Sequence, residues 1–143
     1  MAAFTNYLEN ELIKHIFRTG SFTKPTVLGI ALFTAVAAGE AGTITEVLAT
    51  NVTSTGYARV ELNPDDDHWA AAGTSTDGTT HNDEAITFPE ALLDWGTVTH
   101  FGIYDAASSG ELLIYAQLTA PRTITAGSTP SFAIGALTVQ VDN

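Results

Sequence analysis

The residues best suited to chemistry lie in one polar stretch, residues 63–82, where three consecutive aspartates precede a histidine and a second histidine, His81, lies near the far end. Carboxylate and imidazole groups are ligands for divalent cations, so Asp65, Asp67 and His68 are candidates for a metal site. The twelve-residue calcium-loop pattern is absent, however, and a proline precedes the aspartates. A solvated acidic loop fits the pattern better, and we expect no bound metal or cofactor.

The sequence contains few of the residue patterns that enzymes use for catalysis. The chain has no cysteine, which excludes thiol nucleophiles, disulfides and cysteine-bound metals. It has no Gly-x-Ser-x-Gly elbow, no histidine pair at helical spacing and no glycine-rich phosphate loop. After Lys24 only Arg59 and Arg122 remain to hold an anionic substrate. We therefore predict a protein without catalytic residues, not an enzyme.

Charge is distributed unevenly along the chain. Five Lys and Arg against 16 Asp and Glu give a net charge of −11, which disfavours nucleic-acid binding. Residues 1–25 nevertheless hold Lys14, Arg18 and Lys24 against two acids, whereas the rest of the chain holds two arginines against 14 acids. The imbalance favours either general solvation or an N-terminal segment that docks on an acidic partner. The docking candidates are these three cations and Trp69.

A length of 143 residues fits a single domain. We divide it into an N-terminal helix with its connection (1–25) and a β-domain (26–143) that carries the long acidic loop (63–82). No apolar run approaches the ~20 residues that span a bilayer, and the first residues do not resemble a signal peptide. We expect a soluble protein made in the cytoplasm, with no membrane partner.

One helix is predicted, over residues 6–19. Asn6 is the expected N-cap and Gly20 the expected residue after the C-terminus. The helix carries a broad apolar stripe, formed by Leu8, Leu12, Ile13, Ile16 and Phe17. The stripe packs either on the sheet of the same chain or on a neighbouring subunit.

The remainder has the composition of short strands. Two runs are rich in β-branched and aromatic residues. The first ends near residue 105, and the second begins near residue 111 and reaches Leu118, which predicts a central hairpin. Further strands are expected at 26–34, 55–62, 83–88, 122–125, 131–134 and 136–141 (with a bulge at Gly135), and 43–48 is either an edge strand or a loop. The fold class is mainly β: an antiparallel β-sandwich or partly open barrel of about eight short strands with one N-terminal α-helix. Trp69 predicts that the long loop lies back on a surface.

Several motifs point to a family. The run DWGTVTHFGIYD at residues 94–105, supported by NYLE at 6–9, GYAR at 56–59 and ITFP at 86–89, resembles a family of small tailed-bacteriophage virion proteins. Members of that family often carry labels such as tail-fibre-like or minor structural protein, and the resemblance covers nearly the whole chain. It implies a structural protein of the virion surface and offers no catalytic residue.

The position in the virion is a separate question. No repeat suited to a fibrous shaft is present, so size and charge asymmetry favour a homotrimeric capsid decoration or cement protein that binds itself and the major capsid protein. The alternative is a tail-fibre or baseplate-associated module that binds another tail protein or a host receptor. A third hypothesis is a carbohydrate-binding module that stacks sugars on Trp69, Tyr57 or Trp95.

Overall fold

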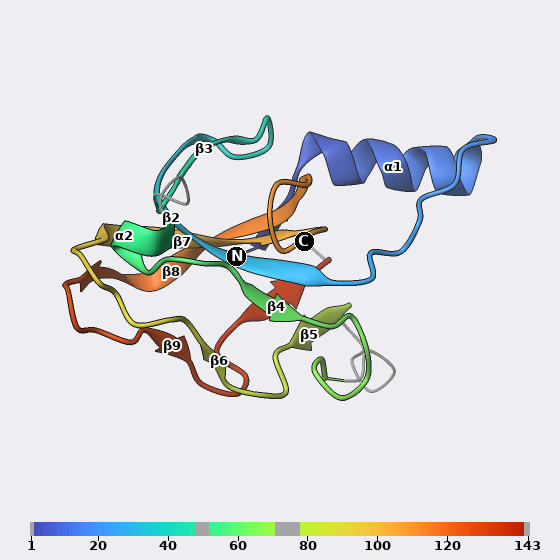
Figure 1. The fold of residues 1–143 in the computed structure, drawn as a ribbon. Coiled ribbons are helices and arrows are strands. Elements are labelled where there is room, and N and C mark those ends of the chain that lie inside the picture. The colour runs from blue at the N-terminus through green and yellow to red at the C-terminus, as the bar shows by residue number, and fades with distance from the viewer. Residues whose placement is uncertain (1, 48–51, 71–77, 142–143) are drawn as a thin grey trace.

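The computed structural model describes residues 2–47, 52–70 and 78–141, and it shows a mainly β protein with a helix near the N-terminus (Figure 1). The strands are β1 (Ala2–Phe4), β2 (Leu28–Ala38), β3 (Thr43–Glu46), β4 (Val60–Leu62), β5 (Thr79–His81), β6 (Ile86–Thr87), β7 (Gly96–Tyr104), β8 (Leu112–Ile124), β9 (Ser131–Phe132) and β10 (Thr138–Gln140), and the helices are α1 (Asn6–Phe17) and α2 (Val52–Thr55).

Six strands form one open antiparallel sheet in the order β1-β8-β7-β2-β3, with β4 also paired to β2. Two small antiparallel sheets, β5 with β10 and β6 with β9, lie beside it (Figure 1). The predicted fold class is confirmed. The sheets are open and do not close into a barrel.

The central hairpin is confirmed as β7 and β8, but β8 continues beyond Leu118 to Ile124. A strand through Pro121 was not expected, because proline lacks the N–H that a sheet requires. The structure supplies the reason. The register with β7 shifts near this residue, between Val98 and His100, and β1 pairs with the outer side of β8 only up to Ala116. Residues 118–121 have no register partner in β7, and no described strand pairs with the outer side of β8 there, so Pro121 occupies an unpaired position.

The large sheet has an apolar cluster on each face. The main core lies between it and the small sheets and includes Ile30, Phe101, Phe88, Leu137 and Val139. A smaller cluster on the opposite face contains Ala31, Phe33, Tyr104 and Leu112, with Tyr115 packed against it.

One detail of the faces differs from simple alternation along β8. Ile103 pairs with Ile114 whereas Tyr104 pairs with Leu112, so Leu113 is an extra residue in β8. Such a bulge reverses which residues face each side. Leu112 therefore belongs to the smaller cluster although Ile114 packs on the main core.

The predicted strand at 55–62 is wrong over its first half. Helix α2 ends at Thr55, Gly56 has φ +72°, and only Val60–Leu62 pair as β4. A side chain at Gly56 would collide with the carbonyl oxygen of Glu90, so close approach as well as the positive φ requires glycine. Tyr57 is consequently fully buried rather than on a wet strand face.

Other segments follow the prediction with shifted ends. The 26–34 strand becomes β2, β3 confirms an edge strand after it, and β6 covers only two residues of the predicted 83–88 strand. Gly135 lies in a turn with φ +73° rather than in a bulge, and β9 and β10 pair with different partners. Strand β5 lies unexpectedly within the acidic loop, of which residues 71–77 are outside the described part.

Helix α1 begins at Asn6, as predicted, but ends earlier, at Phe17. Its N-cap is Thr5, not Asn6, because the buried Thr5 hydroxyl accepts a bond from the Leu8 N–H at 3.4 Å and donates to the Leu112 carbonyl at 2.5 Å. The C-cap is Arg18, so Gly20 lies beyond the helix. No helix in the described part of the chain is long and apolar enough to cross a membrane.

Replacing Thr5 by valine tests this anchor of the helix. The substitution keeps the shape of the side chain but removes the cap, and losing an N-cap costs about 0.5–2 kcal/mol. We expect a lower free energy of unfolding in urea together with a weaker helical circular-dichroism signal. Thr129→Val, at an exposed site, is the control. Equal stability of the two variants would contradict the role of Thr5.

Candidate interaction surfaces

Helix α1 projects from the sheet as an arm, with only its first turns against the β-domain (Figure 1). Leu8 is buried, but Ile13, Ile16 and Phe17 are 51%, 65% and 79% exposed. Residues three and four apart share one side of a helix, so these three form a continuous apolar face. We call it the arm face. Large apolar side chains grouped on a surface mark contact sites for another protein.

The root of the arm is held firmly. The backbone N–H of Thr5 donates to the Leu113 carbonyl at 3.0 Å, and the N–H of Asn6 donates to the Glu40 carbonyl at 2.9 Å. Beyond the helix, the Phe22 N–H donates to Nδ1 of His15 at 3.2 Å. The returning connection is thereby tied to the helix, which presents the arm face away from the sheet.

The predicted docking cations lie on this arm and its connection. Lys14, Arg18 and Lys24 are all exposed, and Nζ of Lys14 lies 2.7 Å from Oε1 of Glu11. Arg18 and Lys24 form no ion pair within the described residues. The arm therefore combines an apolar face with positive charge. Whether these residues dock on a partner remains a prediction.

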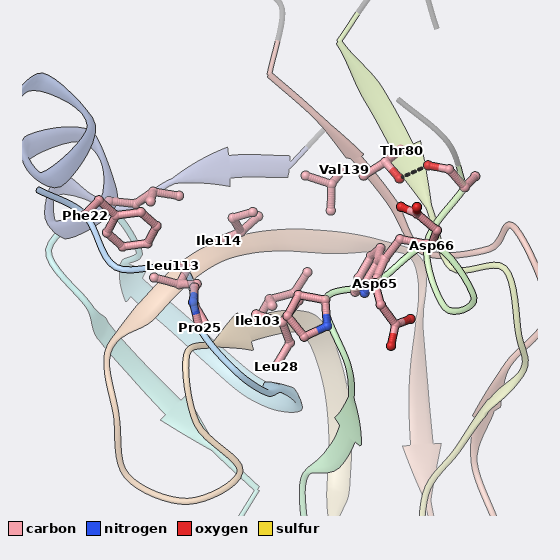
Figure 2. A pocket seen from close by; sticks show the side chains of 14 residues that line it. Phe22, Pro25, Leu28, Asp65, Asp66, Thr80, Ile103, Leu113, Ile114 and Val139 are labelled. Carbon is pink, nitrogen blue, oxygen red and sulfur yellow. Dashed lines mark hydrogen bonds between the residues drawn. The ribbon is translucent and has the colours of Figure 1, made fainter. Parts of the chain in front are cut away.

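A pocket of about 400 Å³ opens at the root of the arm (Figure 2). Phe22 and Pro25 from the connection form one end of it, and Asp65 and Asp66 lie at the other. Between them its lining is almost entirely apolar, contributed mainly by Leu28, Ile103, Leu113, Ile114, Trp69 and Val139. We call this the root pocket.

Trp69 lies back on the β-domain, as the sequence predicts. Its side chain is partly buried against the main core, and its Nε1–H donates to the Asn63 carbonyl at 3.1 Å. Trp69 and Asn82 form an isolated antiparallel bridge, which brings the two described ends of the acidic loop together. Trp69 thereby becomes a wall of the root pocket.

The candidate metal ligands Asp65 and His68 contact each other, and their hydrogen bonds stabilise the loop that carries them. One carboxylate oxygen of Asp65 accepts bonds from the N–H groups of Asp67 and His68, both at 3.2 Å, and from the His68 ring. Nε2 of His68 lies 3.6 Å from Glu84. The bond to Asp65 raises the pKa of His68 and lowers that of Asp65. The described residues contain no group of three or more potential ligands placed to hold a metal ion.

A second polar cluster, which the sequence did not predict, surrounds Arg59. Its guanidinium forms a bidentate pair with Glu46, with both N–O distances 2.8 Å, and donates to the carbonyls of Ala106 and Ser109. It also lies 3.4 Å from the centre of the Tyr104 ring, a cation–π contact. The guanidinium of Arg59 is thus held by a carboxylate, two carbonyls and an aromatic ring of its own chain.

Tyr57 completes this cluster. Its hydroxyl donates to Glu46 at 2.8 Å and accepts from the Leu32 N–H at 3.0 Å. Burial raises the pKa of this phenol far above its usual value, so the hydroxyl remains protonated and able to donate. Tyr57 and Trp95 both lie in the core, which removes them as sugar-stacking platforms and leaves Trp69 alone of the three proposed.

Comparison with protein families gives a match over nearly the whole chain. The model of the family described as podophage GP4 fiber I protein gp80 matches residues 3–140, nearly the whole chain. The search of curated proteins finds no match.

Replacing Tyr57 by phenylalanine tests the Arg59 cluster. The change leaves the buried Leu32 N–H without its partner, and an unsatisfied buried group costs about 1–3 kcal/mol. We expect that loss in the free energy of unfolding measured in urea. Tyr7→Phe, which removes the hydroxyl of a more exposed tyrosine, is the matched control. A Tyr57 variant as stable as the control would refute the role of the hydroxyl.

The pair of His68 and Asp65 predicts a pH dependence. A histidine whose pKa is raised in the folded state contributes stability below its ordinary pKa of 6.5 and loses that contribution as pH rises through the raised value. An NMR titration of the His68 ring should therefore give a pKa above 6.5. Asp65→Asn should lower it, and Asp66→Asn should leave it unchanged. A pKa insensitive to Asp65→Asn would show that the pair is not formed.

Proposed function

We propose that this chain, which belongs to the podophage GP4 fiber I protein gp80 family, is a non-enzymatic building block of a phage fibre that attaches to a neighbouring protein subunit through its helical arm. The family places it among virion structural proteins of the fibre class. The attachment role of the arm is our inference from its surface.

The arm face carries this proposal. Ile13, Ile16 and Phe17 expose most of their apolar surface on a helix that leaves the β-domain, where burying them would be favourable by roughly 25 cal/mol per Å². In the single chain half or more of each of these side chains stays exposed. An assembly protein has a use for such a face, because a partner supplies the surface that the chain itself does not offer.

The family supports one of the two virion locations that the sequence left open better than the other. Capsid decoration was the leading hypothesis, but the family is one of fibre proteins and supports the tail-fibre alternative instead. The decoration hypothesis rested on small size, charge asymmetry and the family resemblance, together with the absence of a shaft repeat. That absence now means that this chain supplies a module of a fibre rather than a long shaft.

Substituting the arm face tests the proposal in the particle. Replacing Ile13, Ile16 and Phe17 by serine should reduce incorporation into virions about tenfold or more, because central apolar anchors dominate protein interfaces. The purified variant should keep the melting temperature of the natural protein, since these side chains are exposed. Copy number is measured by quantitative mass spectrometry of purified particles.

The matched control replaces Leu92, Leu93 and Ile134, three exposed apolar residues of the β-domain, by serine. It should leave the copy number unchanged. Normal incorporation of the arm variant, or an equal loss in the control, would refute the arm as the point of attachment.

A further inference from the structure

We propose that the arm face of one copy binds in the root pocket of a second copy, so that the protein assembles with itself through this contact. The inference rests on the proposed function, in which the arm is the attachment element, and it names the partner. It is carried by three independent features: the reach of the arm, the lining of the pocket and the distribution of charge.

The arm cannot fill the pocket of its own chain. Leu8, on the first turn, already lines that pocket, whereas Ile16 and Phe17 lie eight and nine residues farther along the same helix. At about 1.5 Å per residue, the axial distance is roughly 12–13 Å. The helix is continuous between these positions and is anchored at its root by Thr5. The arm face is therefore available only to another molecule.

The pocket has suitable size and chemistry. An apolar cavity of roughly 150 Å³ holds a benzene molecule, so about 400 Å³ leaves room for two or three large side chains. Its floor of Ile103, Leu113 and Ile114 offers apolar surface but few polar groups that would orient a polar ligand. The arm face supplies the matching set: two isoleucines and a phenylalanine within one and a half turns.

Charge favours a second copy as the occupant. Two copies with a net charge of −11 repel each other wherever acidic surfaces meet. Three of the chain's five Lys and Arg lie on the arm or its connection. The charge of Arg59 is already paired with Glu46. The arm is thus the part of the molecule best able to approach an acidic surface.

The rim of the root pocket is such a surface. Asp65 and Asp66 lie at the end of the pocket opposite Phe22 (Figure 2). The Asp65 carboxylate is engaged by His68, whereas Asp66 forms no ion pair within the described residues. Arg18 directly follows Phe17 on the arm, so inserting the arm face brings a guanidinium to this rim. Opposite charges at the rim of an apolar contact fix its register and speed association.

The contact joins two different surfaces, and repeated contacts of that type close into rings when the rotation permits. A ring of three would agree with the homotrimer expected from the sequence, and a reciprocal pair would use both arms and both pockets. In either assembly the large sheet of each copy lies beside the arm of another.

Cross-linking tests the contact directly, because the natural chain contains no cysteine. Thr19→Cys places a thiol at the arm tip and leaves Phe17 and Arg18 intact. Asp67→Cys places one beside the pocket rim and leaves Asp65 and Asp66 intact. The two variants, one of them carrying a size tag, are mixed and treated with a short bifunctional thiol reagent. We expect the mixed product to dominate.

The control pairs Thr19→Cys with Ile134→Cys, which lies on an exposed part of the β-domain. Cross-linking of 19 to 67 no stronger than in this control would overturn the proposal. Predominant coupling of 19 to 19 would also overturn it, because it would show that two arms contact each other instead.

A charge-reversal series gives a second readout. Arg18→Glu should raise the dissociation constant of the self-complex about tenfold, and Asp66→Arg should do the same. The double variant, which restores opposite charges with their positions exchanged, should recover most of the affinity. Analytical ultracentrifugation measures all three, and failure of the double variant to recover would refute the pairing.

The outcome separates the two proposals. A natural protein that stays monomeric at all concentrations overturns self-assembly, but the arm can still be required for incorporation into virions. If the serine variant of the arm face enters virions normally, the proposed function itself fails.

Discussion

One largely buried ion pair, between Arg59 and Glu46, joins three segments on which the arrangement of the β-domain rests. Their side chains are 9% and 14% exposed, so neither charge is fully hydrated and each needs the other. The pair ties the segment before β4 to the edge strand β3, and the further bonds of Arg59 fix the loop that joins β7 to β8. Three elements far apart in sequence thereby acquire a fixed arrangement on one side of the sheet.

The cluster around Arg59 also illustrates which parts of the fold can be predicted from the sequence and which cannot. The central hairpin and the N-terminal helix are predictable because hydrophobic periodicity over ten or more residues determines them. The same reasoning predicts a strand over 55–62, because the residue pattern does not reveal that Tyr57 and Arg59 bind a distant glutamate, Glu46. Strand β1 is missed because three residues carry no period.

The two candidate binding surfaces also differ in how far the sequence predicts them. The apolar stripe of α1 and the inward position of Trp69 follow from residue types, so both are predictable. The root pocket is not, because Leu8, Trp69 and Val139 meet only after the sheet has formed. The sequence also leaves open whether the stripe is covered by its own sheet. Anchoring of Thr5 at the helix root directs the stripe outwards, and that bond depends on the Leu112 carbonyl of a distant strand.

The outer edge of β8 affects how readily the protein aggregates. Past Ala116 no described strand covers it, and a bare edge is a template for unlimited strand addition between identical chains. Pro121 interrupts that template because it offers no N–H, and the shifted register beside it distorts the remaining groups. Strand addition between chains at this edge is thus discouraged, which protects the protein against open-ended aggregation through its sheet.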